Sequence, residues 1–176
     1  ELSSSLFAVQ DDFRLLFSCG HWDCSFRATA LETGRAVQSV AYHRDVVTSL
    51  CLVRDVRHDY LVTGSRDCTV AVWRLHGADA ALPGGVPDAP DHVLYGHDDA
   101  VTCVAASAEL DVVASGSCDG TIMLHSLRDG SYVRTIAPRR GARGREALLS
   151  GAQPRVHWVG LSCQGLVLSY SHDDAV

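Results

Sequence analysis

A short polar turn recurs four times in this chain of 176 residues, each time behind an apolar run. The copies are CGHWDCSF at 19–26, TGSRDCTV at 63–70, SGSCDGTI at 115–122 and SYSHDDAV at 169–176. Their aspartates, Asp23, Asp67, Asp119 and Asp173, are separated by 44, 52 and 54 residues. A period of this length is typical of a repeated four-stranded unit rather than of a helical repeat. The repeat therefore limits the possible folds more than any single motif does.

The segments around these turns predict β-strands. Apolar, β-branched runs bounded by Gly or Asp favour strands at 46–52, 60–63 and 69–75 in the second unit. The third unit repeats them at 101–105, 112–115 and 121–127, and a fourth strand is expected at 132–136. In the first unit the innermost strand is expected at about 6–9. The sequence thus predicts an all-β fold.

The units span approximately 1–41, 42–92, 93–147 and 148–176. Val176 aligns with Ile122, which places the last residue inside the third strand of its unit. Roughly three and a half four-stranded blades do not close a ring that needs about 4–8 of them. We therefore expect a partial β-propeller, from a longer chain or an aberrant gene product, that aggregates through open strand edges. The segments 77–91 and 138–146 are expected to be surface loops between units.

Composition excludes several classes of function. The net charge of −6 opposes binding to nucleic acid by the chain as a whole. No apolar run approaches the roughly 18 residues of a membrane span, and the first residues lack the features of a secretory signal. Seven cysteines, an odd number, argue against a complete disulfide framework and favour a reducing, cytoplasmic setting.

Two of the turns have a histidine about 22–24 residues upstream, His43 before Asp67 and His97 before Asp119. This spacing carries the chain along one strand and back along the next, so histidine and carboxylate are expected at the same sheet edge. The other imidazole nitrogen is then expected to meet a hydroxyl, Thr63 in the second unit. A buried polar network of this kind stiffens a sheet.

In the complete form of this network, Trp73 donates its indole N–H to the hydroxyl of Thr63. In the third unit Ser115 supplies the hydroxyl, but His125 stands at the tryptophan position. The first unit has Thr29 there and no upstream histidine. The fourth keeps Ser169 and Asp173 but has Gly151 near the histidine position.

With Gly96-His97, the turn aspartates and Trp73-Arg74, the chain resembles the WD-repeat family of β-propellers over nearly its whole length. A narrower similarity is carried by FSCGHWDCSFR, HRDVVTSL, GSRDCTVAVWRL, VLYGHDDAVTCVA and AELDVVASGSCDGTIMLHSLRDGSYVRTI. These segments look like the C-terminal propeller of BEACH-domain, neurobeachin-like proteins. That resemblance implies a scaffold in vesicle trafficking, membrane dynamics or autophagy, cytoplasmic or peripheral on endomembranes through the parent protein.

Two chemical alternatives start from residues in or near the turns. Ser65 near Asp67 and His43 has the ingredients of a hydrolase triad. The same groups recur in register in other units, which favours architecture over one catalytic site. Cys19, His21 and Cys24 have ligand-like spacing for zinc, but no second Cys/His pair of similar spacing follows.

A basic segment offers a further alternative. Arg139, Arg140, Arg143 and Arg145 could meet the phosphates of RNA or of an anionic lipid, or could form a solvated loop. No glycine-rich loop with the strand–loop–helix context of a nucleotide site occurs, so no cofactor is predicted.

The residue before each turn aspartate is the candidate contact for a partner protein. These residues are Trp22, Arg66, Cys118 and His172, and the WD-repeat resemblance implies that they face the rim where partners bind. Trp and Arg are also enriched in binding hot spots. The prediction is a non-enzymatic protein-interaction scaffold. A WD-repeat substrate receptor of a ubiquitin ligase or a chromatin peptide reader is the alternative binding function.

Overall fold

The structure, a computed structural model, describes residues 4–78, 81–137, 155–162 and 167–172, the last of these by their backbone alone. A short 3₁₀ turn, Ser4–Leu6, precedes the first strand. Three four-stranded antiparallel sheets follow in chain order, and then a two-stranded one. The first sheet holds β1 (Phe7–Gln10), β2 (Leu15–Ser18), β3 (Ser25–Ala30) and β4 (Ala36–Ala41).

The second sheet holds β5 (Val47–Val53), β6 (Tyr60–Ser65), β7 (Val70–Arg74) and β8 (His92–Leu94). The third holds β9 (Val101–Ser107), β10 (Val112–Ser117), β11 (Ile122–Ser126) and β12 (Tyr132–Ile136). The fourth pairs β13 (Arg155–Leu161) with β14 (Val167–His172). Each sheet is a meander in which sequential strands are neighbours, so the predicted all-β fold of repeated four-stranded units is confirmed.

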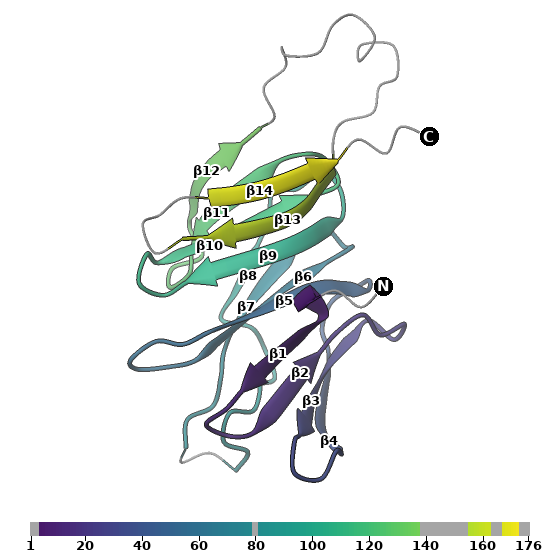
Figure 1. Ribbon diagram of the computed structural model, residues 1–176, viewed down its shortest axis with the longest axis vertical. Coiled ribbons are helices and arrows are strands. Elements are labelled where there is room, and N and C mark those ends of the chain that lie inside the picture. Colours follow the sequence, from purple (N-terminus) through teal and green to yellow (C-terminus); the bar gives the residue numbers. More distant parts are fainter. Residues whose placement is uncertain (1–3, 79–80, 138–154, 163–166, 173–176) are drawn as a thin grey trace, which may run out of the picture.

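The sheets follow one another from the purple first sheet at the bottom of Figure 1 to the yellow β13–β14 pair at the top. Three apolar clusters lie between successive sheets. The first joins Phe17 and Phe26 to Trp73, and the rings of Phe26 and Trp73 pack edge to face with their centroids 5.3 Å apart. The second joins Val62 to Val101 in the third sheet. The core is thus a series of layers between blades.

Strand alternation explains how the second sheet serves two of these layers. Leu61 and Trp73 face the first sheet, while Val62 and Val72 face the third. Successive side chains of a strand point to opposite faces. Because both faces are covered, every residue of β6 is buried, and burying each large apolar side chain contributes about 1.5–3 kcal/mol.

A glycine and a threonine set the spacing between sheets. A Cβ on Gly64 would lie 2.7 Å from Val101 Cγ1, and one on Gly116 would lie 2.6 Å from Val156 Cγ1. At the same two interfaces Thr48 Oγ1 donates to the Val101 carbonyl at 2.6 Å, and Thr102 Oγ1 donates to that of Val156. The repeat therefore includes the contact between sheets, which the strand pattern alone does not indicate.

The segment 77–91 differs from its expected place. It joins β7 to β8 within the second sheet, so the prediction of a loop between two units is wrong. Nor is it wholly on the surface, because Val86 is buried in the first apolar cluster. Its backbone N–H donates to Gln38 Oε1 at 2.9 Å, and Gln38 Nε2 donates to its carbonyl at 2.6 Å. Because the segment is rich in Gly, Ala and Pro, its sequence did not indicate that Val86 anchors the loop to β4.

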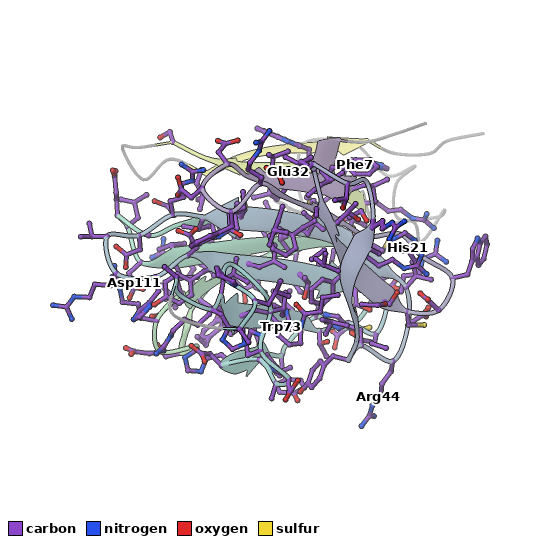
Figure 2. All side chains as sticks on the ribbon, turned by 90° about the horizontal axis from the view of Figure 1, so that it is seen from below. Phe7, His21, Glu32, Arg44, Trp73 and Asp111 are labelled. Carbon is purple, nitrogen blue, oxygen red and sulfur yellow. The ribbon has the colours of Figure 1, made fainter. Side chains whose placement is uncertain are left out.

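No helix in the described ranges is both long and apolar enough to cross a bilayer. Hydrogen-bonded turns lie at both ends of the sheets. Figure 2 shows His21 and Arg44 at one end and Asp111 at the other. We call the end with the β2–β3, β6–β7 and β10–β11 turns the turn rim.

Candidate interaction rim

The turn of the second sheet is held by a buried hydrogen-bond network. His43 Nδ1 lies 3.1 Å from Asp67 Oδ2, and His43 Nε2 lies 2.9 Å from Thr63 Oγ1. The indole N–H of Trp73 donates to the same Thr63 oxygen at 3.0 Å. Because the Asp67 carboxylate can only accept, His43 Nδ1 carries the proton and donates to it, and the unprotonated Nε2 accepts the hydroxyl proton of Thr63. The network ties the segment before β5 to β6 and β7.

Asp67 gathers further donors. Its Oδ2 accepts the Arg44 N–H at 2.9 Å, and its Oδ1 accepts both the N–H and the O–H of Thr69, at 3.0 and 2.6 Å. Burial opposes the charge of Asp67, but the bonds from Thr69 and Arg44 and the neighbouring His43 hold its pKa below the ordinary value. Burial lowers the pKa of His43 despite the attraction of Asp67. A carboxylate therefore accepts a hydrogen bond from a neutral imidazole at pH 7.

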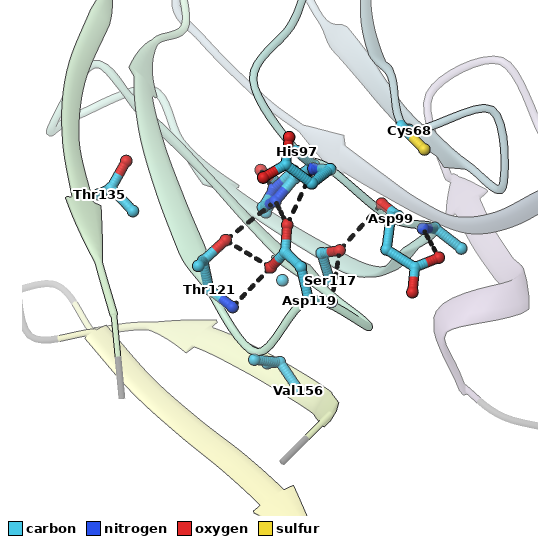
Figure 3. A network of polar contacts seen from close by, with 12 residues as sticks. Cys68, His97, Asp99, Ser117, Asp119, Thr121, Thr135 and Val156 are labelled. Atoms are coloured by element: carbon cyan, nitrogen blue, oxygen red, sulfur yellow. Dashed lines mark hydrogen bonds and ion pairs between the residues drawn. The ribbon is translucent and has the colours of Figure 1, made fainter. Parts of the chain in front are cut away.

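The third sheet repeats the arrangement, as Figure 3 shows. His97 Nδ1 lies 3.2 Å from Asp119 Oδ2, and His97 Nε2 lies 2.8 Å from Ser115 Oγ. Thr121 takes the role of Thr69 and donates to Asp119 at 2.6 Å. At the tryptophan position His125 is buried, and its Nδ1 has no partner among the described residues. The third network thus lacks an indole donor to its hydroxyl.

In the first sheet the turn aspartate is held without a histidine partner. Asp23 Oδ1 accepts the N–H and the O–H of Ser25, at 3.1 and 2.5 Å, and Asp23 Oδ2 lies 2.9 Å from Arg27. These bonds, from Ser25 and then Arg27, lower the pKa of Asp23 to about 2. Thr29 and Cys19 stand where Trp73 and Thr63 stand in the second sheet. The carboxylate of Asp23 is thus held by residues no more than four positions away.

The turns share one backbone shape. Cys24, Cys68 and Gly120 follow the aspartate and have φ values of 59°, 67° and 79°. This left-handed conformation is easy for glycine and strained for other residues. Ser65 braces the turn from inside, because its Oγ donates to the Asp45 carbonyl at 3.0 Å and accepts the Asp67 N–H at 3.1 Å.

These contacts bear on the two chemical alternatives. Ser65 is fully buried, and His43 bonds to Thr63 rather than to it, so the residues do not form a Ser–His–Asp triad. Cys19 is buried, and burial raises the pKa of its thiol to about 12. The part of the chain that the structure describes has no cluster of three or more His, Cys, Asp or Glu suited to a metal ion.

Comparison with known proteins identifies these repeats. The family model described as the neurobeachin beta propeller domain matches residues 1–82 and 84–157. The chain belongs to this family. Its sheets are therefore propeller blades, and the WD-repeat and BEACH-type resemblance drawn from the sequence is confirmed.

Relatives agree with this assignment, and a solved structure agrees with the propeller fold. BEACH domain-containing protein B of Arabidopsis thaliana is 36% identical over 191 residues, covering 99% of this chain and 7% of its own length. A putative neurobeachin homolog of Caenorhabditis elegans is 38% identical over 132 residues, covering 69% of this chain and 5% of its own length. The crystal structure of the WD40 beta propeller domain of Doa1 has a TM-score of 0.62 at 21% identity, covering 93% of this chain and 45% of that one. The chain thus spans a small part of its curated relatives.

On this neurobeachin-type propeller, the candidate contact residues differ in exposure. Trp22 is 94% exposed and Arg66 is exposed, while Cys118 is half-buried. The backbone of Arg66 is fixed, because its N–H donates to the Val46 carbonyl at 3.0 Å. The side chain of His172 lies outside the described residues. So do the side chain of Ser169, residues Gly151 and Asp173, and the basic segment with Arg139, Arg140, Arg143 and Arg145.

Sequence reasoning missed a groove on the turn rim. It has a volume of about 480 Å³, and its lining includes two tyrosines, Tyr42 and Tyr95, together with residues of the β6–β7 turn. Each tyrosine precedes a network histidine, Tyr42 next to His43 and Tyr95 two residues before His97. This recurrence was the available signal. In the sequence alone, each tyrosine is indistinguishable from an ordinary residue at a strand end. Only the fold brings the two segments to one turn.

Proposed function

We propose that the chain is a non-enzymatic protein-interaction platform, the propeller portion of a BEACH-type protein. The observation that carries the proposal is the contrast between adjacent turn residues, Asp67 and Arg66. Asp67 is tied into a buried network, while the Arg66 side chain is exposed on a backbone held by Val46. A turn fixed from inside presents its outward side chain with little loss of conformational entropy on binding.

Trp22 extends this surface to the first blade. A large aromatic side chain that is 94% exposed costs little to dock and supplies much contact area. Trp22 and Arg66 are our principal contact residues for a partner protein, and Cys118 and His172 hold the corresponding positions on the next two blades. The parent protein acts in vesicle trafficking, membrane dynamics or autophagy, in the cytoplasm or peripherally on endomembranes. No cofactor takes part.

The test compares partner capture by the full-length protein and by its point variants, with quantitative mass spectrometry. Trp22→Ala and Arg66→Ala should each deplete the same partners at least about fivefold, the effect of losing a contact worth more than 1 kcal/mol. The matched control is Arg57→Ala, which removes an exposed arginine from the β5–β6 hairpin at the other end of the blade. Identical partner profiles for all three variants would contradict the proposal.

A further inference from the structure

The groove between Tyr42 and Tyr95 offers aromatic surface on a rigid base. Tyr42 is 44% exposed, and its ring packs edge to face on Trp73 at 5.3 Å and on His43 at 6.1 Å. Tyr95 is 70% exposed and lies one residue before Gly96. The Tyr42 ring is therefore positioned by its contacts with Trp73 and His43, and both tyrosines keep much of their surface facing solvent.

The base of the groove is fixed as well. Gly96 adopts a φ of 137°, and a Cβ there would lie 2.7 Å from Met123 Sδ. Asp67 and His97, which also line the groove, are each held by a network hydrogen bond. A site of this kind needs little ordering when a ligand enters, which limits the entropic cost of binding.

The electrostatic surroundings of the groove are negative. Asp67 and Cys68 both line the groove. Asp98, Asp99 and Asp119 lie outside the lining but, after burial and together with Asp67, raise the pKa of the Cys68 thiol. Asp98 and Asp99 are exposed. Two arginines offset part of this charge. Arg44 lines the groove, but Figure 2 shows its side chain extending away from the body of the molecule, and Arg66 is exposed in the β6–β7 turn beside the lining. A positively charged group entering the groove would therefore be attracted.

Aromatic faces beside carboxylates are the chemistry that recognises a guanidinium or ammonium group. Nucleic acids and anionic lipids carry the opposite charge and would be repelled. We infer that this groove binds a basic peptide segment of a partner protein, with an arginine or lysine side chain placed against Tyr42 and Tyr95 and drawn in by Asp98 and Asp99. This inference rests on the proposed function and names the chemistry of the partner.

The test measures fluorescence anisotropy of labelled twelve-residue Gly/Ser peptides with the full-length protein at 0.15 M salt. One peptide carries three arginines, the second three glutamines and the third three glutamates. The arginine peptide should bind, and the other two should not. Asp98→Lys should weaken its binding about fivefold and Tyr95→Ala about threefold, while Arg44→Gln should strengthen it about twofold.

The decisive control is Asp129→Lys. Asp129 is exposed in the β11–β12 turn at the other end of the third blade, so its reversal changes the net charge as Asp98→Lys does. It should leave binding within twofold of the wild type. Equal weakening by both reversals would assign binding to overall charge and overturn the inference, as would tighter binding of the glutamate peptide.

The two proposals fail separately. Loss of partners in Trp22→Ala but not in Tyr95→Ala or Asp98→Lys would overturn the groove assignment and leave the platform intact. Unchanged partner profiles in every rim variant would overturn the platform itself, whatever the peptide does.

Discussion

The first and second blades form the same turn by different means. In the second, Asp67 bonds to a histidine 24 residues away and thereby connects the turn to the preceding blade-to-blade segment. In the first, Asp23 bonds to Ser25 and Arg27, within four residues. The hydrogen bonds of Asp23 in the first blade are local and open to solvent, whereas those of Asp67 in the second blade are long-range and buried. One turn shape is thus compatible with very different contributions to stability.

The largest expected effect tests this difference directly. Asp67→Ala leaves the donors of His43, Arg44 and Thr69 without their acceptor, so the second blade should lose about 3 kcal/mol of local stability. Asp23→Ala should cause a much smaller loss, because Asp23 is itself exposed and water can take its place beside Ser25 and Arg27. Hydrogen-exchange mass spectrometry of the full-length protein measures both. Equal losses in the two blades would show that the buried network adds nothing.

Contacts between blades provide the second test. Gly64→Ala places a methyl group against Val101 and Val104, so the second and third blades must separate slightly. Overpacking of this kind costs about 1–3 kcal/mol, and protection should fall in both blades. The control is Gly77→Ala, since a Cβ at Gly77 meets nothing within 4 Å. A neutral Gly64→Ala would mean that the blades are loosely packed.

The pH dependence should also separate the blades. The pKa values of both His43 and Asp67 are lowered in the folded state. Groups with lowered pKa stabilise the fold above their unfolded values, and this stability is lost as the pH falls toward the folded ones. For His43 the loss begins near 6.5. Exchange protection corrected for intrinsic rates should therefore fall between pH 7.5 and 5.5 in the second blade.

The first blade, which has no such histidine in its turn network, serves as the internal reference for this measurement. His43→Gln should remove the histidine-dependent part of the loss in the second blade. A loss of the same size in the first blade would point to a cause other than the network.

The smallest effect concerns backbone strain. Cys68 has a φ of 67° where the third blade has Gly120, so Cys68→Gly should change stability by no more than about 1 kcal/mol, in the stabilising direction if strain dominates. Cys68→Val should lower it by about 1–2 kcal/mol, because a β-branched residue tolerates positive φ poorly. Urea denaturation followed by exchange in the second blade compares them. If Cys68→Gly destabilised the blade and Cys68→Val left its stability unchanged, the conclusion that the backbone at Cys68 is strained would be contradicted.

Features with a fixed sequence spacing could be predicted from the sequence. The alternation of apolar and polar residues located the strands. The sequence separation of His43 and Asp67 predicted the hydrogen bond between these two residues. Contacts that depend on how blades pack could not be predicted in this way. The bond from Thr48 to Val101 crosses a 53-residue separation, and nothing in the local pattern distinguishes Thr48 from other strand threonines.

The same limit applies to the loop and to the groove. Val86 is one apolar residue in a segment of turn formers, and its burial depends on the space beside Gln38. Tyr42 and Tyr95 form one site only because the fold brings their segments to the same groove as the β6–β7 turn. Short-range chemistry is encoded in the spacing, whereas sites shared between blades come from the tertiary fold.

The central claim is that the β6–β7 turn stabilises the blade through Asp67 and recognises partners through Arg66. Substitution of these two adjacent residues tests it. In the full-length protein, Asp67→Ala and Arg66→Ala are compared by exchange protection of the second blade. The account predicts a large loss for Asp67→Ala and almost none for Arg66→Ala, because only the former leaves buried donors without an acceptor. The reverse order would contradict it.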